Sequence, residues 1–277
     1  MKSTNLVGGL WTASFGEIGA SLKALQDQGV ALEHLARLRS EPEYAKRVAQ
    51  FMLRGGIEGS VHHKLARAIL GKNFWGVEEW SALYGLNFSK KQLREISEFP
   101  WGEDILNSTC PLCGKIVREC HFAHLGLEKF KGVPLTMMKL YELHPTTGQP
   151  RFYADDPWYK NENFATKTTL QFRWYLTHLE IIPNSTNKTY AEQIQMFTEE
   201  YEVPLAMEET LKNFLYYKKN GIYLNPTKWA RCKDLGSVGR RVSLGEFGSD
   251  GLGVGFWVDD YRGGSVGLAS SRKFPKL

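Results

Sequence analysis

The sequence of 277 residues lacks any run of about eighteen apolar residues, so we expect no membrane-spanning helix. The N-terminal segment carries one lysine and a weak apolar stretch that Glu17 soon interrupts, which is not the pattern of a signal peptide. Only four cysteines are present, too few for a disulfide scaffold in a chain of this length. Together these absences predict a cytoplasmic protein in a reducing compartment.

Sequence signatures of common enzyme classes are also missing. There is no phosphate-binding P-loop and no serine in a Gly-x-Ser-x-Gly setting. The glycine run of residues 251–255 has no third glycine at the spacing of a dinucleotide site, and no helix is expected to follow it. No pattern therefore indicates an enzyme, although catalytic groups converge in space rather than in sequence and an unrecognised active site stays open.

The dense basic stripe that is typical of nucleic-acid-binding proteins is missing as well. The net charge is +5, and residues 221–277, with nine basic and five acidic side chains, account for +4 of it. This mild excess favours an ordinary solvated surface over a nucleic-acid site. What the chain does have is a high aromatic share of 13%, which implies a well-filled core, an aromatic surface, or both.

The pattern up to residue 107 predicts short helices. Apolar residues recur at helical spacing between residues 20 and 38, Ser60 fits a helix cap, and Ser89 begins a capping box. We expect residues 1–107 to be almost wholly helical and to pack on the rest of the chain or on another copy, because short helices bury little area alone. Trp75 and Trp80 are the candidate contacts; alternatively, both fill a small local core.

From residue 108 to 277 the pattern is mixed, and we predict one domain there and an α+β fold class. Residues 115–125 and the alternating segment 170–176 are typical of strands. A helix is expected after Pro204, ending at Asn220-Gly221. Glycines recur every few residues over 239–272, which predicts short antiparallel strands joined by tight turns.

Cys110 and Cys113 form a Cys-x2-Cys pair followed by a glycine, which is half of a zinc knuckle. Cys120 and His124 follow at a spacing that would complete four ligands. A strand over 115–125 argues against this site, because it would separate Cys120 from His124 by roughly 13 Å, whereas a helix would bring them together. Two alternatives stay open: a zinc ion held by these four residues, or cysteines without a ligand role.

Large aromatic and charged side chains stand between the glycines of the C-terminal segment. Rigid aromatics and arginine are the residue types that anchor ligands at small entropic cost. The alternative is that Phe256 and Trp257 belong partly to the core and that the remainder is an ordinary loop. The residues concerned are Phe256, Trp257, Asp259, Asp260, Tyr261 and Arg262.

The stretches TKWARCKD, GRRVSLGEFGSDGLGV and VGLASSRKF resemble the ending of C-type-lectin-like modules of the formylglycine-generating-enzyme type. They are most similar to those in the variable proteins of bacterial diversity-generating retroelements, and a looser likeness extends back to about residue 115. The resemblance implies a compact α+β unit whose terminal strands and loops carry the ligand face. It implies that the diversified, solvent-facing contacts are Phe256, Trp257, Asp259, Asp260, Tyr261, Arg262 and Ser265.

The chain departs from that family in two places. Oxidase members of the fold use a reactive cysteine pair in the C-terminal half, where this sequence has only Cys232. The histidine iron site of sulfoxide-synthase relatives has no match. The leading hypothesis is therefore a ligand-binding protein without cofactor, whose partner is a protein or a glycan. A zinc-stabilised regulatory or nucleic-acid-binding protein centred on residues 110–124 is the alternative from another class.

Overall fold

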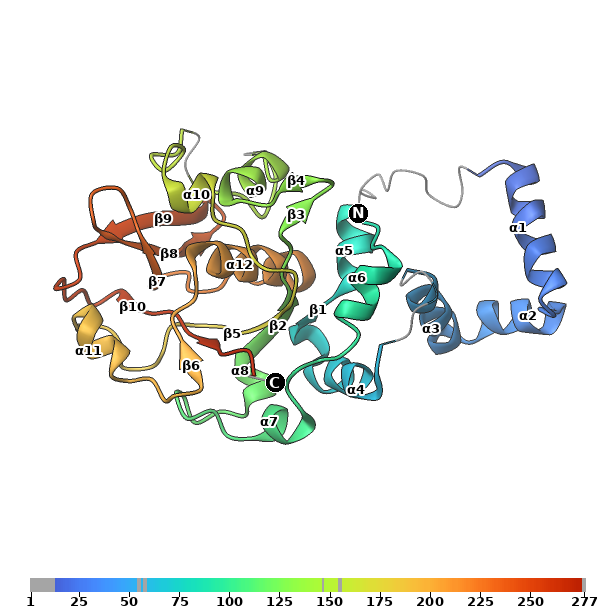
Figure 1. The fold of residues 1–277 in the computed structure, drawn as a ribbon, viewed down its shortest axis with the longest axis horizontal. Helices are drawn as coiled ribbons and strands as arrows, with labels where there is room; N and C mark the ends of the chain where they lie inside the picture. Colours follow the sequence, from blue (N-terminus) through green and yellow to red (C-terminus); the bar gives the residue numbers. More distant parts are fainter. Residues whose placement is uncertain (1–12, 54–55, 57–58, 146, 154–155, 276–277) are drawn as a thin grey trace. The chain divides into compact units, whose positions relative to one another are not determined.

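The computed structural model describes residues 13–275 apart from 54–55, 57–58, 146 and 154–155. Residues 1–12, which begin the segment that the sequence predicts not to be a signal peptide, lie outside the described residues. Helices and short strands are mixed along the chain (Figure 1), and the fold class is α+β, as predicted. Within the described part, no helix has the length and apolar character needed to cross a bilayer. The chain forms two compact units that interleave in sequence: Met1–Glu58 with Gly76–Ser97, and Gly59–Trp75 with Glu98–Leu277.

The first unit consists of short helices. The capping box that the sequence predicts at Ser89 is present, since its hydroxyl accepts from the amide of Gln92 and the Gln92 side chain accepts from the amide of Ser89. Trp80 is buried, with its ring 4.9 Å from that of Tyr84. The helices are α1 (Phe15–Asp27), α2 (Leu32–Ser40), α3 (Pro42–Leu53), α5 (Val77–Tyr84) and α6 (Lys90–Glu95).

The expectation of an almost wholly helical segment up to residue 107 is wrong at β1 (Phe74–Trp75). This strand pairs in parallel with β2 (His121–Leu125), opposite Ala123 and His124. Trp75 is therefore a buried strand residue of the second unit, because its backbone completes the edge of a sheet formed by later parts of the chain. Ser60 caps α4 (Val61–Leu70), as predicted.

A five-stranded sheet in the order β1-β2-β5-β11-β6 forms one layer of the second unit. All its neighbours are antiparallel except β1 and β2. Every residue of β2 and β5 is buried, including the polar side chains of His121, His124, Thr177 and His178. The strands not yet bounded are β5 (Trp174–His178), β6 (Tyr201–Glu202) and β11 (Ser271–Arg272).

The two predicted strands start later than expected. Residues 117–120 form the single helical turn α8 (Val117–Cys120), in which the Cys120 amide donates to the Ile116 carbonyl, and the chain extends only from His121. Over 170–176, the strand begins at Trp174. Ahead of these starting points, Ile116 pairs with Thr109 in an isolated bridge, and the Arg173 amide donates to the Gln171 carbonyl at 2.9 Å. Local turn hydrogen bonds therefore hold these residues in place of a continuous strand ladder.

A four-stranded sheet in the order β10-β7-β8-β9 carries the glycine-rich segment. β8 (Arg241–Gly248) and β9 (Gly251–Trp257) form the expected antiparallel hairpin beside β7 (Trp229–Leu235). β10 (Val266–Leu268) departs from that expectation, because it returns to the far edge of the sheet and pairs in parallel with β7. A side chain at Gly245 would collide with the Lys228 carbonyl, so this position needs glycine.

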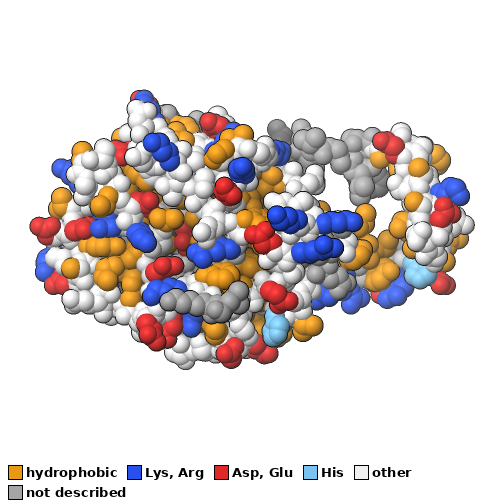
Figure 2. Space-filling model, in the orientation of Figure 1, with side chains coloured by type: hydrophobic (Ala, Val, Ile, Leu, Met, Phe, Trp, Pro, Cys, Tyr) orange, Lys and Arg blue, Asp and Glu red, His pale blue; other side chains and the backbone are white. Residues whose placement is uncertain are grey.

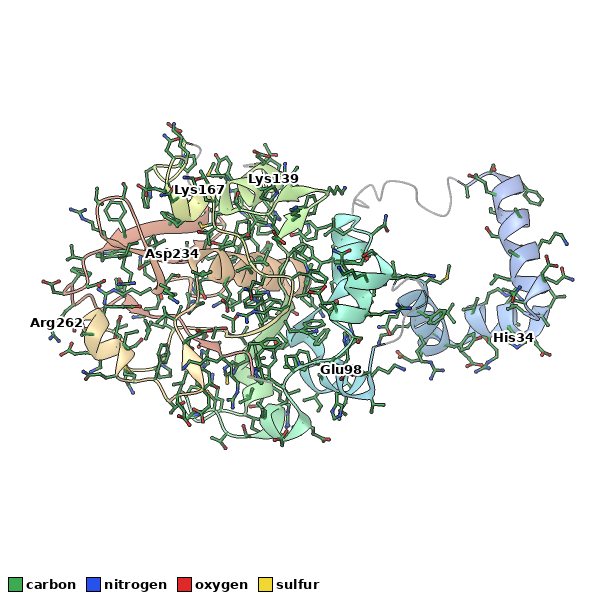
Figure 3. The ribbon with its side chains drawn as sticks, viewed as in Figure 1. His34, Glu98, Lys139, Lys167, Asp234 and Arg262 are labelled. Atoms are coloured by element: carbon green, nitrogen blue, oxygen red, sulfur yellow. The ribbon has the colours of Figure 1, made fainter. Side chains whose placement is uncertain are left out.

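The helix predicted after Pro204 is α12 (Ala206–Asn220), and Gly221 ends it in the left-handed conformation. It contacts β7 and β8 of one sheet and β2 of the other, which places it between the two sheets (Figure 1). Each residue from 206 to 216 is buried, including charged ones. The Asp234 carboxylate (labelled in Figure 3) accepts from the Ala206 amide at 2.6 Å and so satisfies a donor at the buried start of the helix.

The remaining elements are short and cover the edges of the second unit. They are η2 (Gly71–Asn73), α7 (Glu103–Asn107), β3 (Lys129–Phe130), β4 (Val133–Pro134), α9 (Met137–Leu143), α10 (Asn163–Thr166) and α11 (Tyr190–Ile194). A capping box formed by Thr189 and Glu192 begins α11. This short helix contacts β10, and so it lies where the chain returns from β9.

Candidate functional site

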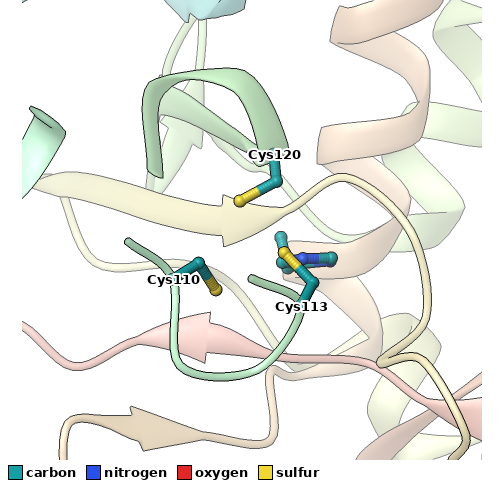
Figure 4. Close-up of side chains that lie close together, drawn as sticks. Cys110, Cys113 and Cys120 are labelled. Atoms are coloured by element: carbon teal, nitrogen blue, oxygen red, sulfur yellow. The ribbon is translucent and has the colours of Figure 1, made fainter. Parts of the chain in front are cut away.

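Cys110 and Cys113 lie on a tight turn that precedes α8. The Cys110 amide donates to the Lys115 carbonyl at 2.7 Å, and the Gly114 amide donates to the Cys110 carbonyl at 2.9 Å. Gly114 has a φ of 75°, a conformation that favours glycine. The Cys-x2-Cys-Gly pattern therefore folds as a knuckle, and Figure 4 shows both sulfurs beside the sulfur of Cys120.

The structure brings together three of the four predicted metal ligands and supplies a different fourth. Cys120 ends α8, and His178 ends β5, whose pairing with β2 places His178 opposite His121. One ligand atom from each of Cys110, Cys113, Cys120 and His178 lies within 4.8 Å of the others. Cys113 is half-buried and the other three side chains are buried.

His124 is not part of this cluster, which corrects the predicted ligand set. Its side chain is buried in β2, where Nε2 lies 3.4 Å from the Thr177 hydroxyl and the ring stacks on Tyr175 at 5.5 Å. Burial lowers the pKa of His124 to about 3, so the ring is a neutral part of the core. The sequence spacing missed His178 because this residue reaches the knuckle only through strand pairing; its place just after the alternating segment is a weak signal at most.

The imidazole of His178 is held in one orientation. Its Nδ1 donates to the Glu180 carbonyl at 2.7 Å, and its buried Nε2 makes no hydrogen bond of regular geometry. Burial lowers the pKa of His178, but the sulfurs of Cys110 and Cys113 outweigh burial and raise it to about 9. The Cys120 thiol lowers the pKa of Cys110, and the same contact raises the pKa of Cys120. The thiols and the imidazole of the cluster are therefore close enough to shift one another's pKa.

A second group of predicted residues lies around the loop of residues 258–265, which joins β9 to β10 and is called the recognition loop below. Trp257 is the last residue of β9 and is half-buried, whereas Tyr261 is 43% exposed. Their rings stack at 6.1 Å and 18°, and Trp257 meets the edge of Trp229 at 5.0 Å. Part of this aromatic group is thus core and part is surface.

The backbone of the recognition loop is fixed from below by Arg231, which is wholly buried in β7. Its guanidinium donates to the carbonyls of Tyr261 at 2.6 Å and Val258 at 3.4 Å. It also donates to the Lys188 carbonyl and the Gln193 side chain at 3.2 and 3.0 Å. Burial lowers the pKa of Arg231. One cation therefore ties the loop to the segment around α11.

Two of the predicted contact residues, Asp259 and Arg262, form ion pairs within the protein. Asp259 accepts two hydrogen bonds from Arg241, at 2.7 and 2.9 Å, and this partner lowers the pKa of Asp259. Arg262, which Figure 3 shows beside α11, donates to Glu192 at 2.8 Å. Both side chains are about half exposed, so they shape the edge of the loop and still face solvent.

The remaining predicted contacts differ in exposure. Asp260 is exposed and Ser265 is half-buried. Phe256 is half-buried against Trp158, with ring centroids 4.7 Å apart in an edge arrangement. Trp158 is 41% exposed and donates from its indole nitrogen to the Val254 carbonyl at 2.8 Å. Trp158 is not among the predicted contacts because it lies about a hundred residues before Val254 and Phe256 in the chain.

Basic and acidic side chains are interspersed with apolar patches over the face of the second unit that Figure 2 shows. The recognition loop itself contains two acidic residues and one arginine. This mixed surface agrees with the mild charge excess of the C-terminal segment, and it does not favour the nucleic-acid alternative.

The chain was also compared with known proteins. No family model matches it, and neither a curated protein nor a solved structure matches it. Function therefore has to be argued from the aromatic surface and from the cysteine–histidine cluster themselves.

Proposed function

We propose that this protein is a ligand-binding protein and that its contact surface is the recognition loop together with the end of β9. The observation that carries the proposal is the stacked pair Trp257 and Tyr261, partly open to solvent, on a backbone that the buried Arg231 holds. A binding loop of this kind loses little conformational freedom when a ligand arrives, because most of its ordering is complete beforehand.

The chemistry of the surface indicates the ligand class. Stacked aromatic rings offer flat apolar area, while the exposed Asp260 and the half-buried Ser265 offer hydrogen-bonding groups beside it. A sugar ring with an apolar face, or a peptide with an aromatic or aliphatic side chain, would use both kinds of contact. We therefore propose a glycan or a protein segment as the partner.

The resemblance to C-type-lectin-like variable proteins supports the same surface. In that family the terminal strands and the loops between them carry the ligand face, and here β9, the recognition loop and β10 occupy those sequence positions. The proposed scaffold consists of Val254, which is half-buried, and of the buried Val266, Gly267 and Leu268. Asp259 and Arg262 are proposed to set the shape of the loop through Arg241 and Glu192, in addition to any direct contact.

Replacing both Trp257 and Tyr261 with Ala is expected to weaken binding about 30-fold or more, because central aromatic anchors contribute about 2 kcal/mol or more to an interface. The probes are a printed glycan array and peptides selected from a random phage-displayed library against the full chain. Affinity is measured by surface plasmon resonance. The melting temperature of the double variant is recorded alongside it.

Tyr153→Ala serves as the matched control, because Tyr153 is an exposed aromatic residue (67%) outside the recognition loop. It should leave binding unchanged. Probes that bind the double variant as tightly as the unaltered protein would contradict the proposed surface. A large loss of melting temperature in the double variant would show instead that these rings belong to the core.

The proposed diversification makes a prediction about the gene. The DNA downstream of the gene is expected to contain a near-copy of roughly its last hundred bases, differing mainly at adenines and lying close to a reverse transcriptase gene. Sequencing the locus tests this. A locus with neither feature would contradict diversification, while the binding surface would still be tested by the variants above.

A further inference from the structure

We propose that Cys110, Cys113, Cys120 and His178 bind one zinc ion, and that this ion holds the knuckle, α8 and the end of β5 together. The four ligand atoms already lie within 4.8 Å of one another. A tetrahedral ion with bonds of about 2.0–2.3 Å holds its ligand atoms about 3.3–3.8 Å apart, so side-chain shifts of up to about 1 Å would close the four atoms around the ion. Figure 4 shows the three sulfurs around a common space.

The side chain of His178 supplies independent support. It is buried, and its Nε2 makes no hydrogen bond of regular geometry, so its neighbours in the cluster leave it incompletely satisfied. Its Nδ1 donates to the Glu180 carbonyl, the second contact that metal-binding histidines usually make, because it fixes the tautomer and turns Nε2 toward the metal. The ring is therefore oriented as a ligand before any ion arrives.

The donor set selects the metal. Three thiolates and one imidazole are soft and intermediate ligands, which suit zinc and disfavour calcium and magnesium, whose ligands are oxygens. With four protein ligands the coordination sphere is complete, so no position is left for water or substrate. The site is thus structural in kind, and no reaction at the metal is proposed.

The place of the cluster explains what the ion would stabilise. The knuckle is tied to the segment before α8 by a bridge between Thr109 and Ile116, whereas His178 lies far along the chain at the end of β5. The carbonyl of His178 also accepts from the buried Lys212 of α12 at 3.0 Å. An ion at this point links a loop with little sheet pairing to the central layer, so its removal should loosen the second unit.

Metal content tests the proposal. Full-length protein, purified without a metal-chelating tag, is expected to contain one zinc ion per chain by inductively coupled plasma mass spectrometry. Chelator should release it and lower the melting temperature by more than about 10 °C, as expected when a structural ion is lost. Replacement by cobalt should give thiolate-to-metal charge transfer and the strong visible bands of tetrahedral coordination.

Variants assign the ligands. Cys113→Ser, at the half-buried ligand, and His178→Ala should each reduce bound zinc at least tenfold, whereas Cys232→Ala, at a buried cysteine outside the cluster, should retain it. His124→Ala should retain the ion as well. If a ligand variant does not fold, alkylation of the unaltered protein decides. Zinc should protect the three thiols of the cluster until chelator is added, whereas the reactivity of the buried Cys232 should not depend on chelator.

Three results would overturn the proposal. One is only trace zinc in the purified protein, with the same melting temperature before and after chelator. Another is full zinc in both Cys113→Ser and His178→Ala. The third is a stable disulfide among the three clustered cysteines under reducing conditions. None of these results bears on the recognition loop, so the metal site and the binding function fail or hold separately.

Discussion

Replacing Lys212 with Met is expected to lower the free energy of unfolding by about 3–5 kcal/mol. Lys212 and Glu209 are 1% and 0% exposed, and their charged groups are 2.6 Å apart. Met fills a similar volume without a charge, so the Glu209 carboxylate would stay buried without its cation. The carbonyls of His178 and Leu179 would also lose their donor. Urea unfolding followed by far-ultraviolet circular dichroism measures the loss.

Two further variants separate the causes. Lys212→Met combined with Glu209→Gln removes both charges at nearly constant volume and should recover more than half of the loss, because no uncompensated charge remains. Lys139→Met breaks an exposed pair with Glu142 (Lys139 is labelled in Figure 3) and should change stability by less than about 1 kcal/mol. If the double variant is as unstable as the single one, the buried charge is not the cause.

The helix that contains Glu209 and Lys212 was predictable from the sequence in part. Its start after Pro204, its apolar stripe and its end at Gly221 are all local signals, and α12 follows them. The burial of Glu209 and Lys212 was not predictable from the same stretch. Each charge is balanced by the other, and the Lys212 ammonium also donates to the carbonyls of His178 and Leu179 at the end of β5. These partners come together only when the two sheets close around the helix.

The C-terminal segment shows a similar division. Glycine spacing predicted strands and turns over 239–272, and the β8–β9 hairpin formed as expected because its pairing is local. The parallel pairing of β10 with β7 was missed, since it requires the chain to cross from one edge of the sheet to the other. Val266 lies opposite Trp229 only after this crossing. The residues next to either one carry no pattern that predicts this pairing.

The cysteine–histidine cluster gives a third example. The knuckle signal at Cys110 and Cys113 was correct about the local turn, and Cys120 does join it because α8 replaces the strand expected there. The fourth ligand was assigned by sequence proximity to His124. In the structure His178 takes that place in the cluster, because antiparallel pairing of β2 with β5 brings the end of β5 beside α8. Spacing along the chain identifies ligands on one loop and fails for those that a sheet supplies.

Replacing Arg231 with Met is expected to lower the free energy of unfolding by about 3 kcal/mol and to loosen the recognition loop. Four acceptors lose a buried charged donor, and two of them, the carbonyls of Val258 and Tyr261, belong to that loop. Buried hydrogen bonds of charged groups contribute about 1.5–3 kcal/mol each, and water reaching the vacated carbonyls offsets part of the total. Urea unfolding measures the stability.

The effect on the loop has its own readout, because stability alone would fall with any damage to the core. The amides of Asn187 and Tyr190 donate to the carbonyls of Gly263 and Asp259, at 3.0 and 2.7 Å, and so report whether the loop stays closed. Their hydrogen exchange should accelerate in Arg231→Met far more than exchange in α12.

Arg231→Lys should be intermediate, since an ammonium keeps the charge but lacks the planar set of donors that reaches all four acceptors. Lys139→Met, which removes an ion pair with Glu142 outside the recognition loop, should leave both measurements almost unchanged. Were Arg231→Met to exchange uniformly faster across the second unit, with no excess at these two amides, Arg231 would be a general core residue rather than the anchor of the recognition loop. The rigidity on which the proposed binding surface depends would then need another cause.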